Sequence, residues 1–406
     1  AGASYGIEQE YDDILSGHSI EQLFSLDPNI PDTISDMPKG ASIVLTIDRK
    51  VQSIVEESIK EAVVNNKAKS GTIIISNPKT GEIMAMATYP RIDPNEYWKS
   101  SEVFTKDNRF NPAVMQPYEV GSVFKVITLA AGIDAGVIKP ETIFNDTGTY
   151  NIMGVSIYNW DRGAWGPQTM IGCMQHSLNT CLSWISEQIG VERFYKYLDA
   201  FGLNQPTGIE LAHEEYYPIS KPGDKYWTPI NLPTNSFGQG IMTTPIQMIT
   251  AVNALANGGK MMKPHIVKAI YFDDHTEITQ PEVIGQPISA ETAKTVTEML
   301  ATSLEVEASD SLMEYTRIAG KTGTGEIAKE GVGYVLSVTN ASFVGWGPVD
   351  DPQFVTYVWL QEPLVNIWGS EVSAPLFSEV MTKVYPYLHL PTDRQLACIY
   401  TEKCPS

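Results

Sequence analysis

Long hydrophobic runs are missing from this chain of 406 residues. A membrane-spanning helix needs about 20 apolar residues in succession, so the sequence predicts no transmembrane helix within its bounds. We identify no signal peptide at the start either, and we interpret Ala1-Gly2-Ala3-Ser4 as a cut end. The composition, 43% hydrophobic and 19% charged, is that of an ordinary globular chain with enough length for one large core or two modest ones.

Basic residues are scarce. The chain has 28 Lys and Arg against 48 Asp and Glu, which gives a formal net charge of -20. Such an acidic balance argues against nucleic acid as a partner and against a polybasic patch that binds a membrane surface.

Metal-binding patterns are missing as well. The 6 His show no metal-ligand spacing, and the 4 Cys form no Cys-x-x-Cys motif. We therefore expect no metal site and no other cofactor.

Three short motifs do stand in order along the chain: Ser122-Val123-Phe124-Lys125, Ser177-Leu178-Asn179 and Lys321-Thr322-Gly323-Thr324. A Ser-x-x-Lys motif alone is expected about once by chance in a chain of this length. Ser76-Asn77-Pro78-Lys79 is such a decoy. Residues 71–76 and 82–88 are predicted strands joined by a turn, and Pro78 would break any helix that could bring this Ser and Lys together.

The first motif has the opposite surroundings. Residues 123–135 are rich in apolar side chains and lack Pro, which predicts a buried helix with Ser122 in its first turn. Lys125 then lies one turn away on the same face. A helix N-terminus favours negative charge on the Ser oxygen, and burial lowers the pKa of a Lys so that its neutral amine can accept the Ser proton. The alternative is a helix-capping Ser with an incidental Lys.

The second motif falls between two segments of helical character, residues 169–175 and 180–189, so we expect a tight connection. There the Ser177 hydroxyl can relay a proton, and the Asn179 amide can bind a substrate carbonyl or hold Lys125 in place. An ordinary inter-helix turn is the alternative. His176 adjoins this motif, but neighbours on a helix point in different directions, so we do not assign it a catalytic role.

The third motif reads as the end of a strand with small residues. Gly323 lets another backbone approach closely, while Lys321 and Thr324 offer a cation and a hydroxyl suited to a carboxylate. The backbone N–H groups of Ser122 and Thr324 are the expected oxyanion hole.

The remaining pattern predicts an α+β fold. A helix is expected at residues 48–64, and late strands at 316–322, 339–346 and 353–360 precede an amphipathic helix. With the early hairpin these strands form an antiparallel five-stranded sheet flanked by helices, and a large helical subdomain is inserted between them. We expect loops at two polar segments that flank the Lys321 strand, residues 302–315 and 326–337.

The three motifs together are the signature of serine β-lactamases and penicillin-binding proteins. The chain resembles the transpeptidase domain of a class B (monofunctional) penicillin-binding protein, also at landmarks such as Glu119-Val120-Gly121, Phe237-Gly238-Gln239-Gly240 and Ala256-Asn257-Gly258-Gly259. The resemblance implies a peptidoglycan D,D-transpeptidase that cross-links stem peptides through a serine acyl-enzyme and is acylated by β-lactams. It implies catalytic roles for Ser122, Lys125, Ser177, Asn179 and Lys321, and substrate binding by Thr322, Gly323 and Thr324.

The resemblance also implies a domain organisation. Residues 1–40 would be the remnant of an N-terminal linker or pedestal region, 41–390 the transpeptidase domain and 391–406 a C-terminal tail. Family members carry an N-terminal membrane anchor, absent from this chain, that holds the catalytic domain outside the cytoplasm. Their implied partners are peptidoglycan stem peptides, β-lactams and the glycosyltransferase of the cell-wall synthesis machinery.

Two other functions use the same residues. A hydrolytic relative would be a D,D-carboxypeptidase or a β-lactamase, although the Glu-x-x-Leu-Asn motif of a class A β-lactamase is missing. A non-catalytic β-lactam sensor would also keep an acylatable Ser. One departure from the family is Gly325-Glu326, where a small residue and an amide are more usual, and it bears on substrate preference rather than on the reaction.

The cysteines allow three complete pairings. We expect a disulfide between Cys398 and Cys404, which lie close together in a polar C-terminal tail. Cys173 and Cys181 are expected to be free, buried thiols, since eight residues of continuous helix span about 12 Å. A sharp turn at Ser177 would instead bring them together.

Overall fold

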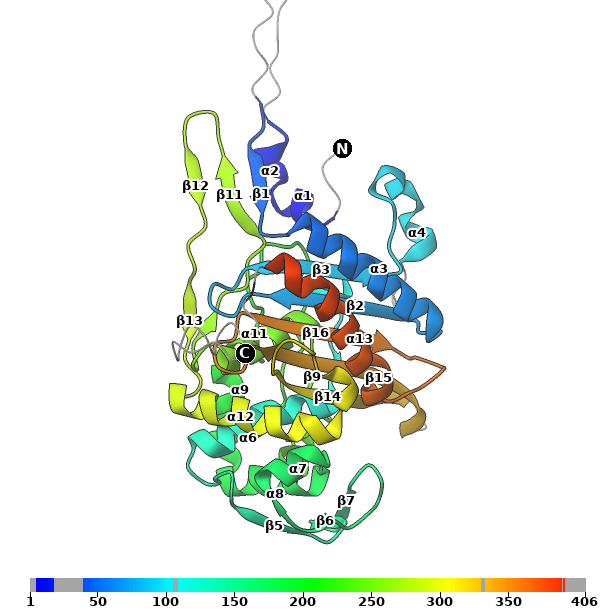
Figure 1. The fold of residues 1–406 in the computed structure, drawn as a ribbon, viewed down its shortest axis with the longest axis vertical. Helices are drawn as coiled ribbons and strands as arrows, with labels where there is room; N and C mark the ends of the chain where they lie inside the picture. Colours follow the sequence, from blue (N-terminus) through cyan, green and yellow to red (C-terminus); the bar gives the residue numbers. More distant parts are fainter. Residues whose placement is uncertain (1–4, 18–38, 105–108, 330–332, 389, 391–406) are drawn as a thin grey trace, which may run out of the picture.

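One antiparallel sheet organises the structure, a computed structural model that describes residues 5–17, 39–104, 109–329, 333–388 and 390 (Figure 1). Its strands lie in the order β14-β15-β16-β2-β3, so the early hairpin joins the late meander as the sequence predicts. The five strands are β2 (Ser70–Ser76), β3 (Ile83–Tyr89), β14 (Ala319–Lys329), β15 (Gly333–Gly347) and β16 (Phe354–Gln361). The predicted α+β class with five antiparallel strands is confirmed.

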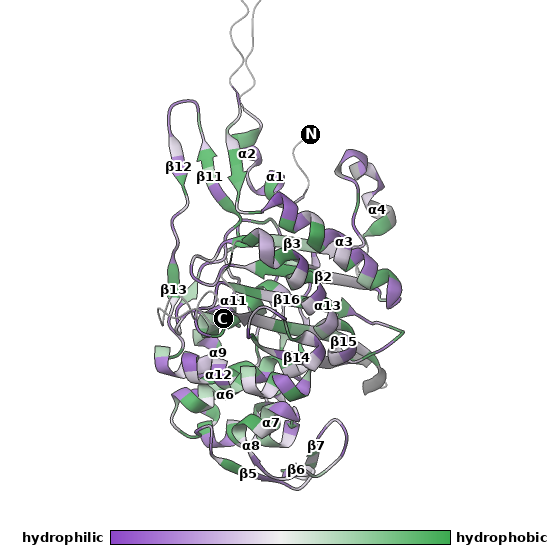
Figure 2. Ribbon diagram, in the orientation of Figure 1, coloured by the Kyte–Doolittle hydropathy of each residue, from purple (hydrophilic) through white to green (hydrophobic). Residues whose placement is uncertain are grey.

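Two helices cover one face of the sheet, α3 (Arg49–Asn65) and α13 (Gly369–Val384). Asp48 caps α3, because its carboxylate accepts hydrogen bonds from the backbone N–H groups of Lys50 and Val51. Apolar residues of α3 at helical spacing are buried, and polar ones alternate with them along the ribbon (Figure 2). The predicted helix at residues 48–64 is therefore confirmed.

The opposite face of the sheet packs against the inserted block. Alternate residues of a strand point to opposite faces, and β2 shows the division: Ile73 and Ile75 join the core under α3 and α13, whereas Ile74 joins the larger core of the inserted block. Trp346 and Trp359 from β15 and β16 also lie in the larger core.

The inserted block runs between β3 and β14. Its helices are α4 (Ser100–Val103), α5 (Pro112–Met115), α6 (Lys125–Asp134), α7 (Met170–Gln175), α8 (Asn179–Ile189), α9 (Val191–Ala200), α10 (Asn231–Asn235), α11 (Pro245–Ala256) and α12 (Ala290–Glu307). Short 3-10 helices are η1 (Pro94–Lys99), η2 (Gly121–Phe124), η3 (Ser309–Ser311) and η4 (Tyr385–Leu388), of which η4 follows α13. Two short N-terminal helices are α1 (Gly6–Glu10) and α2 (Asp12–Leu15).

The block also contributes to small sheets that the sequence did not reveal, one of which includes β1 from ahead of the main sheet. They are β1 (Ser42–Leu45) with β11 (Val267–Tyr271) and β12 (Thr276–Ile278); β4 (Tyr118–Glu119) with β9 (Met242–Thr243); β5 (Ile143–Asp146) with β8 (Gly166–Thr169); β6 (Thr149–Ile152) with β7 (Val155–Tyr158); and β10 (Met261–Met262) with β13 (Val283–Gly285). No helix within the described ranges is both long and apolar enough to cross a membrane.

The two loops predicted beside the Lys321 strand are wrong in part. Helix α12 continues to Glu307, into the first predicted loop. Strand β14 continues to Lys329 and β15 begins at Gly333, so both strands occupy part of the second predicted loop. Glu is a good helix former, so a Glu-rich segment can continue a helix whose other face is buried. Backbone pairing in a hairpin does not require apolar side chains.

A disulfide joins Cys173 and Cys181, which corrects the expectation of two free thiols. Helix α7 ends at Gln175 and α8 begins at Asn179, and between them Ser177 has a φ of 52°. This reversal brings the two Cα atoms to 6.1 Å, within bridging distance. Cys398 and Cys404 lie outside the described residues.

A glycine of β2 sets how closely α3 packs on the sheet. A β-carbon at Gly71 would lie 2.6 Å from Ile59 Cδ1 and 2.7 Å from Val63 Cγ2 of α3. We predict that Gly71→Ala lowers the free energy of unfolding by about 1–3 kcal/mol, because overpacking forces the helix or its side chains to shift. Gly285→Ala is the matched control in denaturant titrations, because a β-carbon at this strand glycine would lie no closer than 3.5 Å to any described residue. Equal stability of the two variants would contradict this account.

The disulfide gives a second prediction. Alkylation of the denatured, non-reduced protein should leave Cys173 and Cys181 unlabelled, and both should be labelled after reduction. Opening a loop of this size should lower the free energy of unfolding by about 2–3 kcal/mol on the chain-entropy account. Labelling of either cysteine before reduction, read by peptide mass, would show that the bridge is not formed.

Candidate active site

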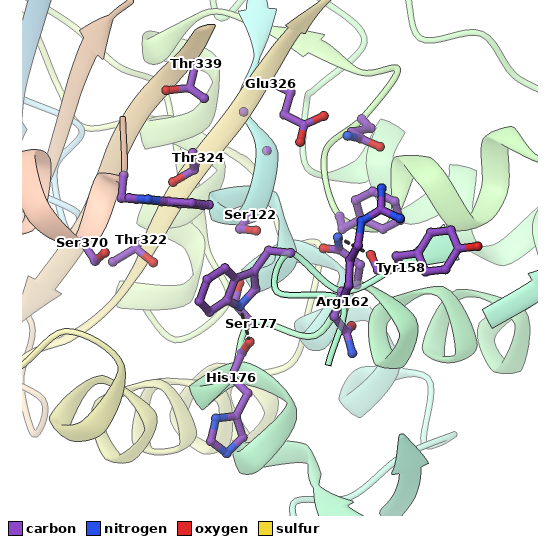
Figure 3. Close-up of a pocket in the computed structure, with 18 of the residues that line it drawn as sticks. Ser122, Tyr158, Arg162, His176, Ser177, Thr322, Thr324, Glu326, Thr339 and Ser370 are labelled. Carbon is purple, nitrogen blue, oxygen red and sulfur yellow. Dashed lines mark hydrogen bonds between the residues drawn. The ribbon is translucent and has the colours of Figure 1, made fainter. Parts of the chain in front are cut away.

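A pocket of about 820 Å³ opens where η2, the α7–α8 connection and β14 meet. Residues of all three sequence motifs border it: Ser122, Ser177, Asn179, Thr322 and Thr324 (Figure 3). Lys125 and Lys321 are fully buried beside them. The fold thus brings together three segments that are far apart in the sequence.

Ser122 lies in η2, one 3-10 turn that runs directly into α6, and its side chain is half-buried. Two glycines bring this turn against β14. A β-carbon at Gly121, whose φ is 60°, would lie 2.8 Å from Gly325 Cα and 3.0 Å from the Thr324 carbonyl oxygen. Only glycine combines that backbone angle with so close an approach. Ser122 is therefore next to the end of the Lys321 motif.

Lys125 is the first residue of α6 and points its amine at the α7–α8 connection. Nζ donates to the Ser177 carbonyl oxygen at 2.6 Å, to Ser177 Oγ at 3.1 Å and to Asn179 Oδ1 at 2.8 Å. Burial lowers the pKa of Lys125 well below its ordinary value; the nearby Lys321 charge lowers it further, and Glu307 opposes the shift. The expected burial of Lys125 is confirmed.

The Ser177–Asn179 segment is built around the left-handed Ser177. This conformation costs a non-glycine residue about 1–2 kcal/mol, and here it turns both oxygens of Ser177 toward Lys125. Asn179 uses its oxygen for Lys125 and donates its Nδ2 to the Tyr158 carbonyl oxygen at 3.0 Å. Of the two uses left open for this amide, the contacts favour holding Lys125.

Lys321 and Thr322 of β14 meet a carboxylate that the sequence did not single out. Glu307, the last residue of α12, forms an ion pair with Lys321 Nζ and accepts a hydrogen bond from Thr322 Oγ1 through the same oxygen, Oε1. The Glu307 side chain is 7% exposed and borders the pocket. No sequence signal identified Glu307 as a site residue, because it is a polar residue in a segment expected to be a loop.

Further along β14, Thr324 Oγ1 accepts a hydrogen bond from the Gly369 backbone N–H at 3.1 Å, so its own hydrogen can be donated to a ligand. Gly323 is closely packed as expected, because a β-carbon there would lie 2.4 Å from Ser342 Oγ and 3.1 Å from the Val120 carbonyl oxygen. The backbone N–H groups of Ser122 and Thr324 remain the predicted oxyanion hole.

An aromatic rim was missed from the sequence. Trp160 packs edge-on against Trp368 at 5.3 Å between ring centroids, and Arg162 lies over the Tyr158 ring at 4.9 Å. All four residues border the pocket, and Trp160 is 55% exposed. The cluster of aromatic residues between Tyr158 and Trp165 was the available signal, because large aromatic rings left exposed beside a cavity are typical of binding surfaces.

His176 and Glu326 also border the pocket. The His176 ring stacks on Trp165 at 3.7 Å, and burial lowers its pKa, which fits a packing role. Glu326, the unusual acidic residue after the third motif, is thus a pocket residue. Burial raises its pKa, and the Arg162 charge opposes the shift.

The decoy motif is inert. Ser76 is fully buried in β2 and its hydroxyl donates to Asn253 Oδ1 at 2.9 Å, while Lys79 pairs with Asp351 at 2.6 Å on the surface. The two side chains serve different neighbours, as the predicted hairpin requires. Within the described ranges, no group of three or more His, Cys, Asp or Glu could hold a metal ion.

Comparison with known proteins agrees with this geometry. A family model for the penicillin binding protein transpeptidase domain matches residues 71–382. Stage V sporulation protein D of Bacillus subtilis is 34% identical over 400 residues, which are 94% of this chain and 60% of that protein. Penicillin-binding protein PbpB of Mycobacterium tuberculosis is 30% identical over 401 residues, 92% of this chain and 57% of that protein. The chain thus spans less than two thirds of the length of these curated relatives.

A solved structure matches the fold as well. The crystal structure of penicillin binding protein 3 from Mycobacterium tuberculosis, complexed with aztreonam, has a TM-score of 0.85 and 28% sequence identity over 97% of this chain and 87% of that one. The family model covers well over half of the chain, and the relatives agree with it. The chain therefore belongs to the penicillin-binding protein transpeptidase family, among its class B members.

Proposed function

We propose that this chain is the catalytic domain of a peptidoglycan D,D-transpeptidase. The observation that carries the proposal is the buried amine of Lys125, which Ser177 and Asn179 hold by hydrogen bonds. Lys125 follows Ser122 by three residues, and Ser122 borders the large pocket. A lysine with a depressed pKa is a suitable base for a serine nucleophile. Relatives named as peptidoglycan D,D-transpeptidases, for example that of Buchnera aphidicola, support the same reaction.

In the proposed reaction, Ser122 Oγ attacks the carbonyl carbon of the penultimate D-Ala of a stem peptide, and its proton passes to Lys125 Nζ. Backbone N–H groups of Ser122 and Thr324 stabilise the oxyanion. The bond to the terminal D-Ala nitrogen breaks, and that nitrogen takes a proton as it leaves. An amine of a second stem peptide then attacks the ester, forms the cross-link and restores the Ser122 hydroxyl.

A β-lactam would acylate Ser122 by the same attack, with its ring amide as the bond that breaks. The leaving nitrogen stays attached to the adduct, which blocks the pocket. Complexes of the Mycobacterium tuberculosis relative with aztreonam and ampicillin support this part of the proposal. We assign Lys321, Thr322 and Thr324 to the substrate carboxylate, because an ammonium and hydroxyls are strong donors to it.

We also propose the organisation of the whole protein. Residues 41–390 would form the transpeptidase domain, which the family match over 71–382 and the pairing of β1 with β11 support. Residues 1–40 would be a linker or pedestal remnant and 391–406 a tail. A membrane anchor ahead of this chain would hold the domain outside the cytoplasm, beside the glycosyltransferase of the cell-wall synthesis machinery.

The first test is the identity of the nucleophile. Incubation with a penicillin should give one stable adduct on Ser122, located by peptide mass, and Ser122→Ala should abolish it while the protein stays folded. Ser76→Ala is the matched control and should be acylated normally, because Ser76 is a buried strand residue. An adduct elsewhere would refute the assignment, and rapid loss of the adduct would point to a hydrolase instead.

The two lysines should respond differently to the same substitution. Lys125→Arg should abolish acylation, since a guanidinium stays charged and cannot accept a proton, whereas Lys321→Arg should keep part of it. In the unaltered protein the acylation rate should fall as pH is lowered through the depressed pKa of Lys125, because the amine becomes protonated. Stopped-flow acylation and circular dichroism of each variant are the measurements. Equal rates for both folded variants would contradict the division of roles.

A further inference from the structure

Glu307 places a carboxylate on two of the three residues that the proposed function assigns to the substrate carboxylate. Its Oε1 accepts from Lys321 Nζ and from Thr322 Oγ1. Glu307 and Thr322 both border the pocket that contains Ser122. A side chain of the chain itself therefore makes the contacts expected of a ligand carboxylate at this position.

The charge of the site explains why this carboxylate is there. Lys321 is fully buried, and a buried ammonium without a partner is strongly disfavoured. In this structure Glu307 supplies the opposite charge. The contact is not complete, because the second carboxylate oxygen, Oε2, is buried and has no hydrogen-bond partner among the residues that the structure describes. A carboxylate bound through one oxygen is easier to exchange than one whose oxygens are both satisfied.

The position of Glu307 also allows it to leave. It is the last residue of α12, and Ala308 after it has a non-helical backbone with φ of -150° and ψ of 65°. A side chain at a helix end can turn away from the pocket without breaking helical hydrogen bonds within the helix interior. The exchange keeps one negative charge beside Lys321 in both states.

We propose that Glu307 is a specificity-determining residue that occupies the carboxylate subsite of the empty enzyme and is exchanged for the carboxylate of the donor peptide or β-lactam. The inference rests on the proposed function. A ligand without an anionic group cannot replace Glu307 without leaving Lys321 unpaired, so the pocket rejects it. A ligand with a carboxylate must compete with Glu307, which slows acylation.

The test compares a penicillin with its methyl ester, which differ at the carboxylate alone. In Glu307→Gln the competing charge is gone, so acylation by the acid should rise about tenfold relative to acylation by the ester. Glu305→Gln is the matched control, two residues earlier on α12 and paired with Arg317 at 3.4 Å, and it should leave the ratio unchanged. A ratio that is unchanged or lower in Glu307→Gln, or an equal fall for both ligands, would overturn the proposal.

Of two further measurements, the first does not depend on catalysis and the second does not depend on the folding of the variant. Acetate should raise the melting temperature of Glu307→Gln but not that of the unaltered protein, and no difference would overturn the inference even if no penicillin reacts and the proposed function fails. A crystal structure of the unaltered protein after reaction with penicillin should show the ligand carboxylate on Lys321 and Thr322, with Glu307 displaced. Glu307 still bound to Lys321 there would also refute it.

Discussion

Burial of the Lys125 amine is the constraint on which the site depends. A buried ammonium is disfavoured, so the surrounding protein both lowers the pKa of Lys125 and satisfies its hydrogens with oxygens from Ser177 and Asn179. Those oxygens are available because the α7–α8 connection reverses sharply at Ser177. The reversal at Ser177 thus supplies oxygens to the Lys125 amine, and it also brings Cys173 and Cys181 within bridging distance.

The sheet supplies the fixed side of the pocket. Strand β14 pairs along its length with β15, so Lys321, Thr322 and Thr324 are held by a ladder of backbone hydrogen bonds. Close approach of η2 to that strand requires glycine at Gly121, where both the backbone angle and the contact with Gly325 leave no room for a side chain. Rigid support on both sides is what a site needs to hold reacting groups in a productive geometry.

Two buried lysines in one site create a charge problem that Glu307 answers. Lys321 lowers the pKa of Lys125 and Glu307 raises it, so the carboxylate offsets part of the effect of Lys321 on Lys125. The same carboxylate faces the pocket, where an anionic substrate can take its place. The Glu307–Lys321 ion pair then both neutralises the Lys321 charge and selects for an anionic ligand.

Much of the fold and most residues of the candidate site could be predicted from the sequence. Periodicity and turn residues predicted the five-stranded sheet and α3, Pro78 identified the decoy, and the three motifs named the residues that meet at the pocket, because these signals are local. Tertiary structure decided the Cys173–Cys181 bridge, the Glu307 contact and the position of the aromatic side chains at the rim of the pocket. These depend on which distant segments the fold brings within a few ångströms, and no local pattern encodes that distance.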